Sequence, residues 1–241
     1  MRTETLPVEL AMPGEEPRTT ARSKYRRLLG ISAAVMFAML VSLALFWAPE
    51  DAKQGAAQRI FYIHVPAAWI GFLAFFVVFV ASLGVLFKGS RRWDDVAAAS
   101  AEIGTVFTTA VLITGPLWGR PVWGVYWTWD PRLTSFLMLW LIYLSYLVLR
   151  GYVPDPARRA RYSAVLGIVG FLDVPIVYLS VRWWRSEHPT QFVFERGALP
   201  SQMLVTLLFG IATFTVFYAY LMHVRIRTGR LQEAAEEEVY S

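Results

Sequence analysis

The chain of 241 residues is 56% hydrophobic and only 17% charged, which excludes an ordinary water-soluble globular protein and an intrinsically disordered one. It contains no cysteine, which excludes disulfides, thiolate metal sites and cysteine nucleophiles. The net charge of +5 alone would suit a nucleic-acid partner, but no recognition motif accompanies that charge, so we expect no nucleic-acid role.

Six apolar segments follow one another along the chain, each close to the ~20 residues that a membrane-spanning helix needs. They are Leu28–Ala48, Phe61–Phe87, Ala97–Leu117, Leu133–Leu149, Ala164–Val181 and Ser201–Met222. Transmembrane strands would instead show alternating segments of about ten residues. The sequence therefore predicts an all-α polytopic membrane protein, with a six-helix domain over residues 28–224 between the tails 1–27 and 225–241.

The basic residues predict how the bundle is oriented. Sixteen of the 23 Lys and Arg residues lie in the two tails and in the loops 88–92 and 150–161, whereas seven lie in the other three loops. The positive-inside rule then places both termini in the cytoplasm and makes the segments 49–63, 118–132 and 182–200 face outward. We interpret the first apolar segment as an uncleaved signal anchor, because it is long enough to span the membrane.

Two of the three histidines lie on the predicted outer face. We expect Pro66 to open the second helix, which would place His64 at the mouth of the bundle. His188 precedes Pro189 and is therefore biased towards an extended backbone. Two neutral imidazoles presented from opposite sides suit the axial positions of a haem iron, whereas zinc usually takes three or four ligands. The alternative is interfacial placement without ligation, which is our interpretation of His223.

Four tryptophans crowd the outward segment 118–132, namely Trp118, Trp123, Trp127 and Trp129, with Tyr126 among them. On a helix, Trp123 and Trp127 would share one face with Asp130. An interfacial aromatic belt explains one or two tryptophans at a helix end, but four in one loop favour a flat apolar platform for a large planar ligand. Asp130 precedes Pro131 and is either the cap of the fourth helix or an orienting group for the tryptophans.

These residues resemble a known motif. The run Trp123–Asp130 (WGVYWTWD) is similar to the tryptophan-rich WWD motif of the haem-handling proteins of cytochrome c maturation. The runs Thr114–Pro121, Arg132–Ser135, Tyr62–Trp69 and Trp183–His188 extend the similarity. Six helices over residues 28–222 resemble the CcmC family of haem exporter proteins most, because the related CcmF and CcsA families have more helices.

The resemblance implies that haem b is bound non-covalently on the periplasmic face of the bacterial inner membrane, between His64 and His188. The WWD loop would contact the macrocycle and the chaperone, through Trp118, Trp123, Gly124, Tyr126, Trp127, Trp129 and Asp130. The resemblance further implies delivery of haem to the chaperone CcmE, in a complex with the ABC subunits CcmA and CcmB and the small membrane protein CcmD. The chain would then be a delivery protein and not an enzyme.

Haem propionates need cationic partners. We expect Arg132 in this role first, and Arg182 or Arg185 second. Secondary candidates around the site are Trp69, Trp183, Trp184 and Glu187. Glu187 adjoins His188, where relatives are not usually acidic, and it could accept the imidazole N–H.

Two acids inside the apolar segments support a different interpretation. Glu102 and Asp173 would form the binding site of a transporter subunit for another small molecule, because intramembrane carboxylates usually face the interior of a bundle. The structural alternative is that Asp173 caps the backbone released by Pro175 and that Glu102 lies near the inner interface. A third reading, a cytochrome c haem lyase, needs an apocytochrome site, and we see no large extra domain for one.

Overall fold

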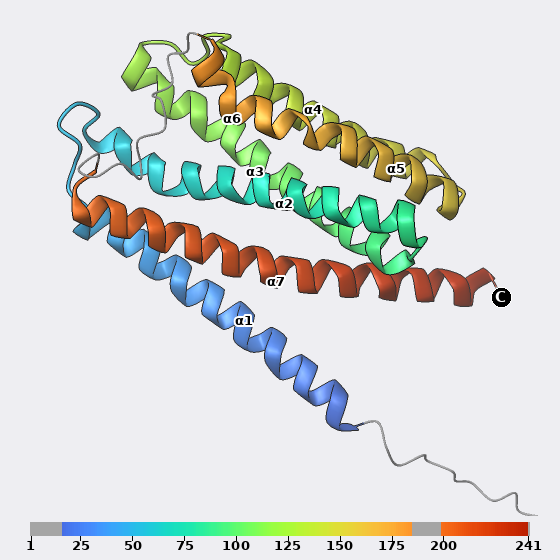
Figure 1. The fold of residues 1–241 in the computed structure, drawn as a ribbon. Coiled ribbons are helices and arrows are strands. Elements are labelled where there is room, and N and C mark those ends of the chain that lie inside the picture. The colour runs from blue at the N-terminus through green and yellow to red at the C-terminus, as the bar shows by residue number, and fades with distance from the viewer. Residues whose placement is uncertain (1–15, 185–198, 241) are drawn as a thin grey trace, which may run out of the picture.

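The computed structural model describes residues 16–184 and 199–240, which form a helical bundle (Figure 1). The helices are α1 (Glu16–Ser42), α2 (Phe61–Lys88), α3 (Arg91–Trp123), α4 (Pro131–Tyr152), α5 (Pro156–Phe171), α6 (Asp173–Trp183) and α7 (Ser201–Tyr240). A π-helical turn, Leu43–Trp47, extends α1, and a 3-10 turn, Ala56–Ile60, leads into α2. These elements provide six spans long and apolar enough to cross a membrane, so the predicted all-α, six-span fold is confirmed.

The ends of the helices follow from local sequence. Asp130 and Asp155 each precede a proline and accept a backbone N–H from the first helical turn, at 2.9 Å for Asp130 and 2.7 Å for Asp155. Gly124 adopts a left-handed backbone with φ of 79°, which ends α3 at Trp123. Successive spans run in opposite directions, so the C-terminal end of α3 and the N-terminal ends of α2, α4 and α7 lie at one end of the bundle (Figure 1). We call it the tryptophan-rich end.

The fifth predicted segment, Ala164–Val181, is not one helix. It is divided between α5 and α6, which meet at Leu172. Pro175 has no N–H to return to the carbonyl of Phe171, and this accounts for the break. The expected capping role of Asp173 is not found: no side-chain cap forms at this junction, and its Oδ2 is buried without a hydrogen-bond partner among the described residues.

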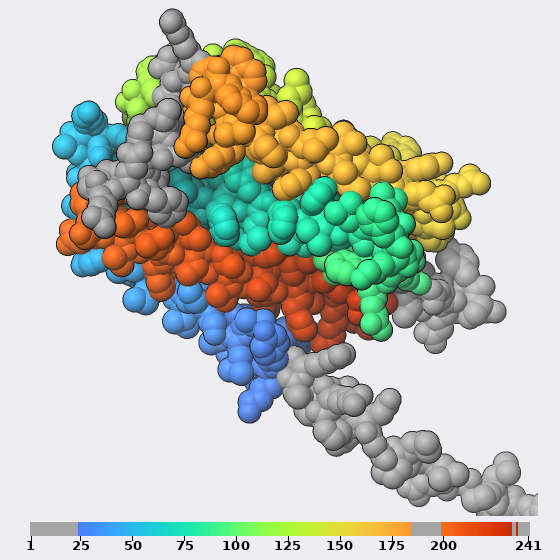
Figure 2. All heavy atoms as spheres, in the orientation of Figure 1, coloured from blue at the N-terminus to red at the C-terminus, as the bar shows by residue number. Residues whose placement is uncertain are grey.

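The packing is centred on α2, which contacts α3, α5 and α7. In the space-filling view, α7 fills the space between α1 and α2 (Figure 2). Small residues allow the close approaches that stabilise helix pairs in lipid. A Cβ at Gly104 would lie 2.7 Å from the ring of Phe75, and one at Gly167 would lie 2.8 Å from Oγ of Ser82. The ring of Phe75 in turn stacks on Tyr143 of α4 at a centroid distance of 3.5 Å.

Ion pairs join the helices at the end opposite the tryptophans. Arg150 of α4 donates to both carboxylate oxygens of Asp94 in α3, at 2.6 and 2.9 Å. Arg225 of α7 pairs with Glu102 of α3, with one N–O distance of 2.7 Å. Glu102 is thus part of a structural ion pair in this half of the bundle. His223 lies two residues before Arg225 and packs edge-on to Tyr25 at a centroid distance of 6.2 Å.

Candidate functional site

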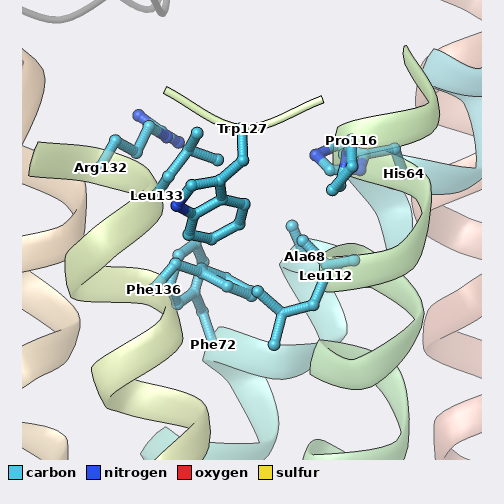
Figure 3. Close-up of a pocket in the computed structure, with 11 residues that line it drawn as sticks. His64, Ala68, Phe72, Leu112, Pro116, Trp127, Arg132, Leu133 and Phe136 are labelled. Atoms are coloured by element: carbon cyan, nitrogen blue, oxygen red, sulfur yellow. The ribbon is translucent and has the colours of Figure 1, made fainter. Parts of the chain in front are cut away.

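A recess at the tryptophan-rich end is lined by three helices and by the loop 124–130, which connects α3 to α4 (Figure 3). It contains about 460 Å³ of empty space, part of which is open to the surface. Only about 50 Å³ of it is enclosed, less than the ~300–1,000 Å³ of a typical small-molecule site, so a ligand as large as a porphyrin would also occupy the open part of the recess. The lining residues are His64, Ala68 and Phe72 of α2, Val111, Leu112, Gly115 and Pro116 of α3, Trp127 of the loop, and Arg132, Leu133 and Phe136 of α4.

His64 lies on the first turn of α2 and lines the recess. The expectation that Pro66 opens this helix is wrong, because α2 begins at Phe61 and contains Pro66 in its interior. Pro66 has no N–H, so it donates no helical hydrogen bond to the carbonyl of Tyr62. The ring of Pro66 and this carbonyl oxygen both lie against Gly210 of α7. Even so, His64 reaches the mouth of the bundle, because α2 starts only one turn earlier.

The imidazole of His64 is held by α3. Its Nδ1 lies 2.9 Å from Oγ1 of Thr114, and its Cε1 lies 3.3 Å from the position that a Cβ on Gly115 would occupy. The ring of Trp118 packs edge-on to the imidazole at a centroid distance of 5.6 Å. Three positions on one helix therefore fix the ring of the candidate ligand.

Trp118 and Trp123 do not lie in a loop as predicted. They belong to α3, which continues through Pro116 and Pro121 to Trp123. The expected helical face shared by Trp123, Trp127 and Asp130 is also wrong, because Gly124 ends the helix between the first two. Trp123 instead packs on its own helix, with its ring 2.8 Å from where a Cβ on Gly119 would lie.

The loop 124–130 places Trp127 in the recess (Figure 3). The indole of Trp127 descends between His64 and Pro116 on one side and Arg132 and Leu133 on the other, and it points towards Phe136. Its Nε1 is buried and has no hydrogen-bond partner in the described part of the chain. Trp129 packs edge-on to Trp127 at a centroid distance of 5.5 Å but remains 69% exposed, with a left-handed φ of 56°.

Other contacts fix the ends of this loop. Arg120 donates to the carbonyl of Gly124, and its guanidinium lies 5.6 Å from the centroid of the exposed Tyr126 ring. Asp130 is buried and caps α4, so the capping interpretation of this residue is confirmed. The cap sets the first turn of α4, and that turn presents Arg132 and Leu133 to the recess.

Several predicted site residues do not line the recess. Trp69 faces α7, where its Nε1 donates to Oγ1 of Thr215 over 3.1 Å. Arg182, Trp183 and Trp184 are exposed at the end of α6, where the two tryptophans pack edge-on to each other. Glu102 and Asp173 are likewise absent from the lining. The remaining candidates, Arg185, Glu187 and His188, lie outside the described residues.

The recess combines three chemical groups. Its walls are apolar and aromatic, with one imidazole at one side and one guanidinium at the other (Figure 3). Among the residues that the structure describes, no three His, Asp or Glu side chains come together as a site for a bare metal ion. The arrangement suits a flat apolar ligand that carries its own metal and has acidic groups at its edge.

Sequence reasoning missed the residues that support His64, which are Thr114, Gly115 and Gln54. A usable signal existed for Thr114, since it is four residues from Trp118 and shares a helical face with it once α3 is extended to Trp123. Gln54 supports His64 indirectly, since it accepts a hydrogen bond from Nε1 of Trp118 over 2.8 Å. It gives no such signal, because this contact depends on how the segment before α2 lies against α3.

Comparison with known proteins agrees with the motif. A family model described as Heme exporter protein C matches residues 8–240. "Heme exporter protein C" of Bradyrhizobium diazoefficiens is 41% identical over 219 residues, covering 89% of this chain and 81% of the relative. The protein of that name in Escherichia coli K12 is 34% identical over 200 residues, covering 80% of each chain. A "putative cytochrome c biosynthesis ccmC-like mitochondrial protein" of Marchantia polymorpha is 33% identical over 192 residues, covering 79% of this chain and 82% of the relative. The chain therefore belongs to the heme exporter protein C family.

Proposed function

We propose that this membrane protein binds haem b in the recess and delivers it to another protein during cytochrome c maturation. The observation that carries the proposal is the recess, which brings together His64 of α2, Trp127 of the loop and Arg132 of α4. Haem needs an axial nitrogen, apolar aromatic surface and a cation for its propionates. The name Heme exporter protein C, carried by relatives over most of the chain, supports the same function.

In this proposal His64 supplies one axial nitrogen and His188 the other. Two imidazoles hold haem iron without a covalent bond to the porphyrin, and the lack of cysteine excludes thioether attachment to this chain. Haem then stays exchangeable, which delivery requires. Arg132 is the first candidate for a propionate, because it lines the recess on the side away from His64 (Figure 3). Arg182 and Arg185 are second candidates.

The loop 124–130 is proposed to serve both haem and the recipient. Trp127 lies in the recess, whereas Trp129 and Tyr126 are exposed beside it and can contact an incoming protein. From the family resemblance we propose that the recipient is the chaperone CcmE and that the chain works with CcmA, CcmB and CcmD. Haem delivery is its role, without catalysis of bond formation.

The delivery proposal is tested with the full chain, expressed in a haem-replete host that lacks the chaperone and purified in detergent. Pyridine haemochrome and acid-acetone extraction measure bound and extractable haem. We expect close to one extractable haem b per chain, and its loss to an added soluble chaperone domain. A protein that contains no haem in this host, or that keeps its haem in the presence of the chaperone, would contradict the proposal.

The proposed orientation puts the recess on the periplasmic side and both termini in the cytoplasm. Because the chain has no cysteine, each introduced cysteine is its sole thiol. Val125 and Tyr152 are both exposed and lie at opposite ends of the bundle. An impermeant maleimide should label Val125→Cys in intact spheroplasts and Tyr152→Cys only after lysis. The reverse pattern would place the recess in the cytoplasm.

A further inference from the structure

The hydroxyl of Thr114 lies between two groups that can bond to it. Nδ1 of His64 is 2.9 Å from Oγ1 of Thr114, and Oγ1 in turn donates to the carbonyl oxygen of Ala110 over 2.8 Å. A hydroxyl has one proton, and a carbonyl oxygen can only accept. The two contacts therefore determine which atom donates in each.

Only one protonation pattern makes both contacts hydrogen bonds. If the Thr114 proton points to Ala110, Nδ1 of His64 must carry a proton and donate it to Oγ1. If the Thr114 proton pointed to Nδ1 instead, the oxygens of Thr114 and Ala110 would lie 2.8 Å apart with no proton between them. The first pattern has two hydrogen bonds and the second has one, so the Thr114 contacts favour the neutral imidazole with its proton on Nδ1 and its lone pair on Nε2.

We infer that Thr114 is a positioning residue, which fixes His64 in the tautomer whose Nε2 can bind a metal. The inference rests on the proposed function, in which His64 ligates haem iron. A hydrogen bond from the second ring nitrogen orients a metal-bound histidine and raises its basicity. Thr114 accepts this hydrogen bond, and it lies on α3, whereas His64 lies on α2. Gly115 and Trp118 confine the same ring from α3.

The chain is suited to a direct test of the tautomer, because it has only three histidines. Haem-free protein labelled with ¹⁵N-histidine reports the protonated nitrogen of each ring by NMR, and His64→Ala identifies the His64 signals. Thr114→Val removes the acceptor at nearly constant volume, and Thr114→Ser keeps it. Thr105→Val is the matched control, since the Thr105 hydroxyl also donates to a carbonyl within α3, that of Ala101 at 2.8 Å.

We expect His64 to be protonated on Nδ1 in the unaltered protein, in Thr114→Ser and in Thr105→Val. In Thr114→Val the tautomer ratio should move roughly fivefold towards Nε2–H, the effect of losing one hydrogen bond of ordinary strength. An Nε2–H tautomer in the unaltered protein would overturn the inference, and so would an unchanged ratio in Thr114→Val. The first of these outcomes needs no variant to fold.

A second readout uses haem-loaded protein. Loss of the Nδ1 hydrogen bond weakens the imidazole as a donor, so the reduction potential should rise in Thr114→Val and stay near the original value in Thr114→Ser. The two proposals fail separately. A haem spectrum that is unaltered in His64→Ala would remove the ligand role of His64, whereas the tautomer measurement on haem-free protein decides the role of Thr114.

Discussion

The indole of Trp118 on α3 is tied to Gln54, which lies in the segment before α2. Its Nε1 donates to Oε1 of Gln54 over 2.8 Å, while its ring packs edge-on to His64 and to Phe61. Trp118 therefore packs against His64, the candidate iron ligand, and also holds the segment before α2 through Gln54. An interfacial aromatic belt would not require either contact.

Gln54→Ala should loosen haem in the recess. Without its acceptor, Trp118 loses a hydrogen bond of about 1 kcal/mol and no longer confines His64 firmly, so haem should dissociate roughly fivefold faster. Transfer of haem to an excess of apomyoglobin measures this rate. Lys53→Ala is the control, because the Lys53 side chain is exposed. Equal haem dissociation rates in Gln54→Ala and the unaltered protein would show that the hydrogen bond between Trp118 and Gln54 does not affect haem retention.

Gly115→Ala should weaken haem binding by displacing the imidazole of His64. The added methyl group would lie 3.3 Å from Cε1 of the imidazole, and a ring pushed off its preferred rotamer costs about 0.5–1.5 kcal/mol, or up to roughly tenfold in affinity. Gly151→Ala is matched, because a Cβ there meets no atom within 4 Å. Haem titration of both variants checks the effect, and equal affinities would contradict it.

The two loop tryptophans should separate haem binding from haem transfer. Trp127→Ala removes the indole from the recess and should lower haem retention, because that ring forms part of the recess lining. Trp129→Ala removes an exposed ring, so it should keep haem but slow its transfer to the chaperone. Haem content and transfer rate are measured on the same preparations. Loss of haem in Trp129→Ala, or full retention in Trp127→Ala, would reverse these assignments.

Asp130 should matter to stability as a helix cap. Asp130→Ala removes the acceptor for the N–H of Leu133 and should destabilise the protein by about 1 kcal/mol. Asp130→Asn keeps an acceptor of similar capping strength and should unfold at nearly the original temperature. Thermal unfolding in detergent compares the two. If Asp130→Asn lowers the unfolding temperature as much as Asp130→Ala does, the charge of the carboxylate and not its capping hydrogen bond stabilises α4.

Hydropathy located all six spans, because a helix in lipid needs mainly length and apolar composition. It could not locate the helix ends at the tryptophan-rich end. Pro66 was expected to open a helix, yet it lies inside α2, where Gly210 of α7 packs against its ring. The third span was expected to end at Leu117, yet α3 continues through Pro121 to Trp123. Pro175, by contrast, does coincide with a break, between α5 and α6.

Only part of the candidate site was predicted, because residue types can be read from the sequence but contacts between helices cannot. His64 was predicted as an axial ligand, Trp127 from the crowding of four tryptophans and Arg132 as a cation for propionates, and the structure brings all three to one recess. Trp69 was a secondary candidate, and it packs on α7 instead. The roles of Thr114 and Gly115 depend on how α2 and α3 lie against each other, and His64 and Thr114, 50 positions apart in the sequence, give no local signal of that alignment.

The visible spectrum of the haem-loaded protein beside its histidine variants, prepared in a host without the chaperone, tests bis-histidine ligation. We predict a low-spin, six-coordinate haem in the unaltered protein and in His223→Ala, since His223 lies at the end of the bundle opposite the recess. His64→Ala and His188→Ala should each lose one axial ligand and shift towards high spin. Spectra in which neither variant differs from the unaltered protein would contradict bis-histidine ligation.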